Sequence, residues 1–299
     1  MHTAFGPIVT AAVTPFSPDG SVNHDAFRAV LRHLVENGST AVVVCGTTGE
    51  SPTVTDDEKL AIFRTAVDEI GGTVPVIAGT GTNDTHHSIE LTHAACEVGV
   101  DGVLVVTPYY NKPPREGLLR HFKAVARASS VPVIVYNIPS RVVINLEPDL
   151  IAELAGIENV VAVKQANPDL AQSREIASLV PDLALYAGND DLLLPLLSLD
   201  SCVGGICVAS HLVGTEMAQV VEAWRAGDEG RARDIDGSLA DVYETLAITS
   251  NPIPVKAALN FMGIDVGGVR MPLIEASGME NERIRAMLER HGLTAGVTA

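Results

Sequence analysis

The stretch Asn159–Lys164 reads Asn-Val-Val-Ala-Val-Lys, an apolar run typical of a buried β-strand that ends in a lysine. An ammonium group at the end of a buried strand is desolvated, and desolvation favours the neutral amine that can attack a carbonyl carbon. Lys164 is therefore a candidate nucleophile for a Schiff base. The alternative is a lysine whose side chain extends from the strand end to solvent.

The other four lysines of the chain have simpler sequence contexts. Lys59 and Lys123 lie in helical patterns, Lys112 in a proline-rich loop and Lys256 at the expected start of a helix. Lys164 is thus the only lysine that the sequence places at the end of an apolar strand.

The run at 160–164 is one of eight β-rich runs that alternate with amphipathic segments. Strict alternation with nearly continuous apolar strands predicts a parallel sheet covered by helices, and eight such units predict a (β/α)₈ TIM barrel. An open doubly wound sheet is the alternative, but no GxGxxG follows the first strand. The predicted strands are 8–13, 41–45, 74–78, 102–106, 131–136, 160–164, 184–187 and 203–208, and the predicted helices are 25–37, 56–70, 85–98, 115–129, 148–155, 170–179 and 190–199.

After residue 208 the pattern is helical only, with helices expected at 215–226, 229–250, 254–262 and 281–291. We therefore predict a catalytic barrel domain over residues 1–225 and a C-terminal helical appendage over residues 226–299.

Composition excludes several classes of partner. The formal charge of −17 argues against nucleic acid and anionic membranes, which need basic patches. No apolar run reaches the roughly 18 residues of a membrane span, and the N-terminus shows no secretory pattern. The four cysteines form no CxxC pair and have no histidines at zinc spacing, so we predict no metal, no cofactor and a cytoplasmic location.

In a barrel of this kind the active site lies at the carboxyl ends of the strands. The second strand is followed by Gly46–Ser51 (GTTGES), whose glycines and hydroxyls suit an anion. The fourth is followed by 107–114 (TPYYNKPP) and the fifth by 136–141 (YNIPSR), which bring tyrosines and an arginine to the same end. A tyrosine can move protons and an arginine can hold a carboxylate.

Together with 251–259 (NPIPVKAAL), these motifs resemble the dihydrodipicolinate synthase and N-acetylneuraminate lyase superfamily of Schiff-base aldolases. The similarity extends from Gly6 to about Pro272, and the double threonine and the Ser140–Arg141 pair are most similar to the dihydrodipicolinate synthase branch. The resemblance implies a homo-oligomer, either dimer or tetramer, that uses pyruvate and aspartate semialdehyde as substrates.

The resemblance also implies roles for individual residues. Lys164 would form the imine with pyruvate, and Tyr136, Thr48 and Tyr110 would relay protons, with Tyr110 reaching into a neighbouring subunit.

Four more residues would bind substrates, again as the resemblance implies. Thr47, together with Thr48, would hold the pyruvate carboxylate, and Arg141 would hold the carboxylate of the aldehyde. Gly188 and the carbonyl of Ile206 would line the pocket.

Two alternatives stay open at the level of the sequence. A paralogous aldolase acting on a 2-keto-3-deoxy sugar acid or a hydroxy-oxoacid would use the same imine chemistry. A non-catalytic barrel that senses oxoacids would lack the lysine or the tyrosines, and both are present.

The sequence departs from the family pattern in two places. Gln165–Pro168 follows the lysine where an acidic residue is common, which leaves the shape of the next loop open. Lysine-inhibited relatives bind lysine through histidines and a glutamate, but here Asp56, Lys59 and His87 stand at those positions. We therefore predict little or no inhibition by lysine, because a cationic ligand would meet Lys59.

Overall fold

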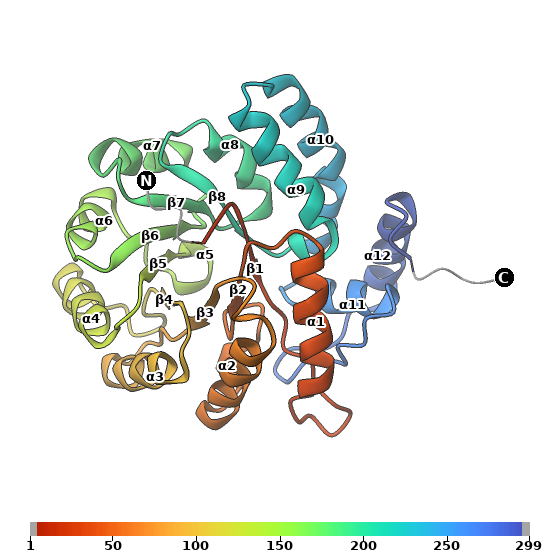
Figure 1. Cartoon of the computed structure of the whole chain (residues 1–299), viewed down its shortest axis with the longest axis horizontal. Helices are drawn as coiled ribbons and strands as arrows, with labels where there is room; N and C mark the ends of the chain where they lie inside the picture. The colour runs from red at the N-terminus through yellow and green to blue at the C-terminus, as the bar shows by residue number, and fades with distance from the viewer. Residues whose placement is uncertain (1–4, 295–299) are drawn as a thin grey trace.

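A computed structural model describes residues 5–294 of the chain, and its centre is a closed barrel of parallel strands (Figure 1). The strands follow one another around the barrel in sequence order, and β8 pairs with β1 to close it. The predicted barrel is confirmed. The strands are β1 (Ile8–Ala11), β2 (Ala41–Val44), β3 (Val76–Gly79), β4 (Gly102–Val106), β5 (Val133–Asn137), β6 (Val160–Gln165), β7 (Ala184–Ala187) and β8 (Cys202–Cys207).

Alternation along each strand divides the apolar side chains between two cores. One set, which includes Ile77, Ile134 and Tyr186, fills the barrel interior. The alternate set, which includes Val76 and Val135, packs between the strands and the surrounding helices. Both faces of the sheet are buried, which explains why the strands are nearly continuous apolar runs.

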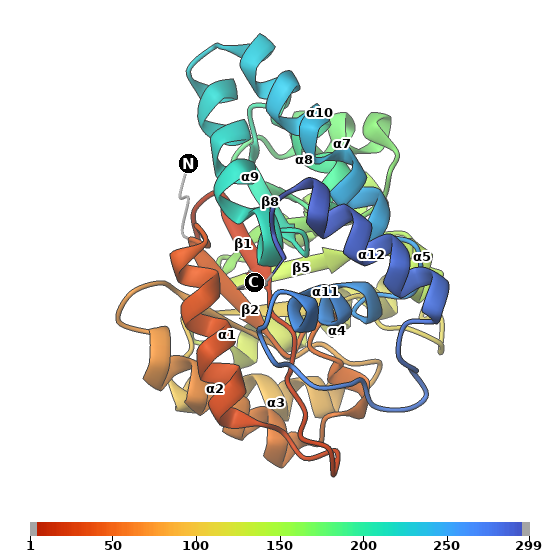
Figure 2. The same cartoon turned by 90° about the vertical axis from the view of Figure 1, so that its right-hand side faces the viewer.

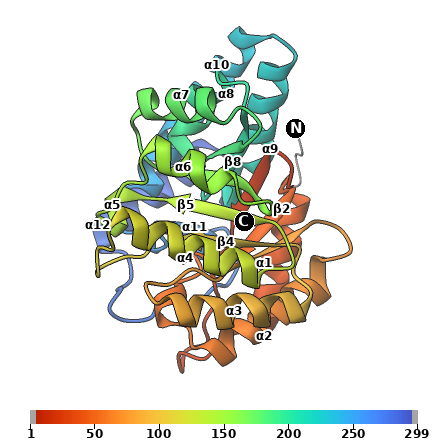
Figure 3. The ribbon, with the colours of Figure 1, turned by 90° about the vertical axis from the view of Figure 1, so that its left-hand side faces the viewer.

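Helices surround the barrel, and a view turned by 90° from Figure 1 shows α3, α4, α6 and α7 along its outer side (Figure 3). Several begin at capping side chains, such as Asp84 before α3 and Asp169 before α7, and Thr55 forms a capping box with Glu58. The helices between strands are α1 (His24–Glu36), η1 (Ser51–Thr53), α2 (Asp56–Ile70), α3 (Thr85–Val98), α4 (Arg115–Ala128), α5 (Pro139–Val142), α6 (Pro148–Ala155), α7 (Leu170–Leu179), η2 (Asp190–Leu192) and α8 (Leu193–Leu197).

The last four helices are α9 (Ser210–Arg225), α10 (Glu229–Leu246), α11 (Ile253–Phe261) and α12 (Gly278–Arg290). Helix α10 lies against α9, and α12 lies against α10 and α11 beside the barrel (Figure 2). The division at residue 226 falls between α9 and α10, and the two-domain description stays a prediction.

Two of the predicted helices were wrong in detail. The helix expected at 215 begins at Ser210 and contains a kink at Val213, and the one expected over 190–199 is a 3₁₀ turn followed by the short α8. Helix α5 and the turn η1 were not predicted, because each is too short to show a periodic pattern. Among residues 5–294, no helix combines the length and the apolar character needed to cross a bilayer.

Candidate active site

A cavity of about 650 Å³ opens at the carboxyl ends of the strands and is closed on one side by helix α10 and the segment after it. Its walls carry both proton-transferring and charged groups. Among the lining residues are Thr47, Thr48, Tyr136, Arg141, Lys164, Gly188, Asp190, Asp236, Tyr243 and Asn251.

Lys164 enters this cavity from β6. Its Cα pairs with Tyr136 on β5 and Tyr186 on β7, and its Nζ lies 4.2 Å from the centroid of the Tyr136 ring. Only 5% of Lys164 is exposed, and within residues 5–294 its ammonium has no hydrogen bond or ion pair. An unpaired amine in an enclosed site is available to a carbonyl ligand.

Small residues make room around this lysine. Ala162 and Ala166 lie in the barrel interior on the same face of β6 as Lys164, two positions before and after it. A Cβ at Gly188 would lie only 2.7 Å from the Cβ of Ala166, so glycine is required there. The space beside the amine thus follows from the sequence of β6 and β7.

The turn after β2 presents two threonines to the same cavity. Gly49 and Glu50 fold the turn back by donating to the carbonyls of Gly46 and Thr47, at 3.1 Å each. The backbone N–H groups of Thr47 and Thr48 have no acceptor within the part of the chain that the structure describes. Two free amides beside two hydroxyls form a site suited to a carboxylate.

Asn251 connects two of these groups, although sequence reasoning gave it no role. Its Nδ2 donates to Thr48 Oγ1 at 3.0 Å, and its carbonyl accepts from Arg141 Nη2 at 3.3 Å. It lies just after α10, so the C-terminal helices contribute directly to the site. The NPIP motif was the available signal, but no periodicity shows what its asparagine contacts.

Acidic groups form a further part of the cavity wall. Asp190 accepts from the amides of Val208 and Ala209 at 2.8 and 3.1 Å, yet burial raises the pKa of its carboxyl. Burial and Asp236 also raise the pKa of Tyr243, whose hydroxyl lies 3.4 Å from that carboxylate. The wall therefore carries groups that hold protons more tightly than usual.

Two predicted site residues do not line this cavity. Tyr110 is 89% exposed, with a left-handed backbone (φ 74°), and it points outside the site of its own chain. The side chain of Ile206 is fully buried in the interior of the barrel, and the cavity is lined instead by Val208, the residue after β8.

Lys59 and Lys256 lie in helices, as the sequence predicts, but both are buried. Lys59 is 5% exposed and Lys256 only 2% exposed. Each has an acidic partner, since Lys59 Nζ lies 3.2 Å from Asp56 and Lys256 Nζ lies 2.9 Å from Glu50. Lys164 is distinguished by its missing partner rather than by burial.

The loop after Lys164, whose shape the sequence did not predict because of Pro168, is held by side-chain hydrogen bonds. Asn167 donates to Asn145 at 3.1 Å and also to Gln172, and the residue after Pro168, Asp169, caps α7. The departure from the family pattern is therefore compatible with a regular β6–α7 connection.

A second cavity of about 380 Å³ shares Thr47, Tyr136 and Arg141 with the first and extends to Lys59 and His87. Within residues 5–294, no group of three or more His, Cys, Asp or Glu side chains is placed to hold a metal ion.

A (β/α)₈ barrel with an unpaired lysine in its mouth has the architecture of an imine-forming lyase. Residues 4–291 match the model of the dihydrodipicolinate synthetase family, and the chain belongs to that family. It is 46% identical over 289 residues to the 4-hydroxy-tetrahydrodipicolinate synthase of a Cyanothece species, with 96% of this chain and 98% of the relative covered.

Solved structures of dihydrodipicolinate synthases have the same fold as this chain. Dihydrodipicolinate synthase of Cyanidioschyzon merolae with lysine bound has a TM-score of 0.95 and 41% identity, covering 97% of this chain and 99% of that one. The chloride-inhibited dihydrodipicolinate synthase of Acinetobacter baumannii in complex with pyruvate has a TM-score of 0.93 and 36% identity, covering 97% and 99%.

Proposed function

We propose that this protein condenses pyruvate with aspartate 4-semialdehyde to give 4-hydroxy-tetrahydrodipicolinate, a lyase reaction of lysine and diaminopimelate biosynthesis. The observation that carries this proposal is the buried, unpaired amine of Lys164 in the same cavity as the free amides of Thr47 and Thr48. Family membership supports it, and the names of the relatives favour this activity over that of a paralogous sugar-acid aldolase.

Lys164 attacks the keto carbon of pyruvate, and loss of water leaves an imine between Nζ and that carbon. The amides and hydroxyls of Thr47 and Thr48 receive the carboxylate of pyruvate. The imine nitrogen withdraws electrons, so a methyl proton leaves and an enamine forms. Tyr136, whose ring lies beside the ammonium, is the first group to exchange that proton.

The enamine carbon then attacks the aldehyde carbon of the second substrate and forms the new carbon–carbon bond. Arg141 holds the carboxylate of that substrate at the cavity rim, where its guanidinium is already oriented by the carbonyl of Asn251. The substrate amine closes the ring by attacking the imine carbon, which releases Lys164. Gly188 lines this site, and we assign the backbone carbonyl of Ile206, rather than its buried side chain, to the border of the same pocket.

Tyr110 completes the relay in a neighbouring subunit, because its exposed ring cannot serve the site of its own chain. The active protein is then a cytoplasmic dimer or tetramer. Sedimentation of a fully active monomer would remove Tyr110 from the relay.

The test is a condensation assay with pyruvate and aspartate semialdehyde, run beside a panel of keto-acid cleavage reactions. We expect turnover in the condensation at a kcat/KM at least about 100-fold above that of any cleavage. Faster cleavage of a 2-keto-3-deoxy sugar acid would overturn the assignment.

A further inference from the structure

Behind the Thr47–Thr48 turn lies an ion pair that the reaction does not use. Glu50, only 3% exposed, adopts a left-handed backbone (φ 55°), and its carboxylate points away from the cavity. Glu50 Oε1 accepts from Lys256 Nζ at 2.9 Å, and Oε2 accepts from the backbone N–H of Arg270 at 2.8 Å. Lys256 Nζ also donates to the carbonyl of Thr14 at 2.9 Å.

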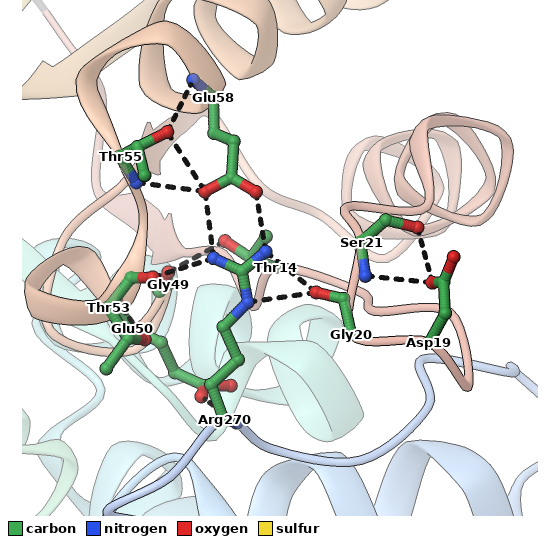
Figure 4. A network of polar contacts seen from close by, with 10 residues as sticks. All are labelled: Thr14, Asp19, Gly20, Ser21, Gly49, Glu50, Thr53, Thr55, Glu58 and Arg270. Carbon is green, nitrogen blue, oxygen red and sulfur yellow. Dashed lines mark hydrogen bonds and ion pairs between the residues drawn. The ribbon is translucent and has the colours of Figure 1, made fainter.

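A second ion pair, between Arg270 and Glu58, lies beside Glu50 (Figure 4). The guanidinium of Arg270 donates to both carboxylate oxygens of Glu58, at 2.8 and 2.6 Å, and to the carbonyls of Thr53 and Gly20 at 2.6 and 2.7 Å. The hydrogen bonds from Arg270 hold the pKa of Glu58 at about 2. Thr14 Oγ1 donates to the carbonyl of Gly49 at 2.8 Å, beside Glu50 in the turn.

An aromatic ring joins the two cations. Lys256 Nζ and Arg270 Cζ lie 4.3 and 4.4 Å from the centroid of the Phe16 ring, within the range of cation–π attraction. We call Glu50, Lys256, Glu58, Arg270 and Phe16 the clamp. It connects the segment after β1, the turn after β2, helix α11 and the segment after α11.

Stability alone is a weak explanation for such an arrangement. Burying an ion pair costs desolvation energy that its attraction often fails to exceed, so apolar residues of similar shape can serve as well. The location of the clamp is more informative, because Glu50 N–H donates to the carbonyl of Thr47 and Asn251 donates to the hydroxyl of Thr48. The segment that holds Asn251 continues into α11 and so to Lys256.

We propose that Glu50, held by Lys256 and Arg270, is a positioning residue that fixes the Thr47–Thr48 turn for the carboxylate of the keto-acid substrate. This inference rests on the proposed function, since it assigns the turn to pyruvate. The C-terminal helices then set the affinity for the first substrate without contacting it. Displacements of a fraction of an ångström in such a turn are enough to weaken a two-amide contact.

The main test is the double variant Glu50→Gln/Lys256→Met, which removes both charges and leaves neither buried without a partner. We expect a rise of about tenfold or more in the KM for pyruvate and a matching loss of borohydride trapping at subsaturating pyruvate, because the amide contacts are misaligned. The KM for the aldehyde, which depends on Arg141, should change less than about threefold.

The matched control is Ile284→Ala in α12, a buried core position far from the turn in sequence. It should lower the melting temperature and leave both KM values unchanged. An unchanged pyruvate KM in the folded double variant, or an equal rise in Ile284→Ala, would overturn the inference.

If the double variant does not fold, Arg270→Gln takes its place, because it keeps the backbone N–H to Glu50 and loses the outer ion pair together with the other contacts of the guanidinium. It should raise the pyruvate KM by about threefold, with rescue by Arg270→Lys, and no rise would be decisive against the clamp. Failure of borohydride and pyruvate to label the wild-type protein would instead refute the proposed function.

Discussion

Lys164 at the end of β6 and Lys256 in α11 are buried to a similar extent, with 5% and 2% of their surfaces exposed, but they have different partners. Lys256 binds Glu50 and a backbone carbonyl, whereas Lys164 lies over the ring of Tyr136 and has no hydrogen bond or ion pair within residues 5–294. The ammonium of Lys256 is engaged in an ion pair, whereas the amine of Lys164 is available to react with a carbonyl group. Burial therefore does not identify a nucleophilic lysine unless the partners of the ammonium are also known.

The largest expected effect tests the free lysine. Lys164→Met should lower kcat/KM for the condensation by at least about 10³-fold, because no other lysine among residues 5–294 lines the catalytic cavity. After treatment with pyruvate and borohydride, peptide mass spectrometry should place the reduced adduct on Lys164. Recovery of the adduct on Lys256 or Lys59 would erase the distinction between paired and unpaired lysines.

The paired lysine should show its effect in stability. Lys256→Met leaves the carboxylate of Glu50 buried without its cation, which should lower the free energy of unfolding by about 3–5 kcal/mol. Lys164→Met is the matched control, because it removes a buried ammonium that has no partner, and its stability should be unchanged or higher. Urea denaturation compares the two, and equal losses would contradict the comparison.

The variant Arg141→Ala tests whether the two substrates bind through different residues. The KM for aspartate semialdehyde should rise by about 10- to 100-fold, the usual cost of a lost hydrogen bond to a charged group, and pyruvate trapping at Lys164 should persist. Steady-state kinetics with each substrate varied, together with borohydride trapping, measures both. Parallel loss of trapping would mean that Arg141 also serves the pyruvate site.

A smaller effect concerns the outer ion pair of the clamp and its dependence on pH. Glu58 has a pKa of about 2 in the folded protein against an ordinary value of 4.5, so the unfolded chain binds its proton first as the pH falls. The stabilisation is complete above pH 4.5 and is lost as the pH falls toward 2. The stability difference between wild type and Arg270→Gln should therefore shrink between pH 5 and pH 3, as followed by urea titration. A stability difference that does not change with pH would show that the Arg270–Glu58 ion pair is not its cause.

The third buried lysine gives the smallest effect. Lys59 and His87, which line part of the second cavity, both bind Asp56, at 3.2 and 2.7 Å, so this carboxylate is already engaged. Free lysine would bring a further cation, at a cost on the order of 1 kcal/mol. We expect little inhibition by millimolar lysine in a condensation assay. A cooperative inhibition curve with a midpoint below about 1 mM would contradict this.

Much of the fold was predictable because its causes are local. Alternating apolar strands and capped helices specify the barrel, and the strand ends then bring Lys164, Tyr136 and Thr48 to one cavity. The pairing of Lys256 with Glu50 was not predictable, since those residues are 206 positions apart and nothing in the motifs at 46–51 and 251–259 shows that their side chains meet. The contacts of Asn251 depend on the same long-range packing.

The positions of the clamp residues in the sequence also determine when, during synthesis of the chain, the site can be completed. Every strand-end group that faces the substrates, from Thr47 to Gly188, has been synthesised before Asn251, Lys256 and Arg270 leave the ribosome. A nascent chain can therefore close its barrel, since β8 ends at Cys207, while the turn after β2 still lacks its C-terminal contacts. We expect the emerging enzyme to stay inert until the last seventh or so of its translation, when helices α11 and α12 arrive.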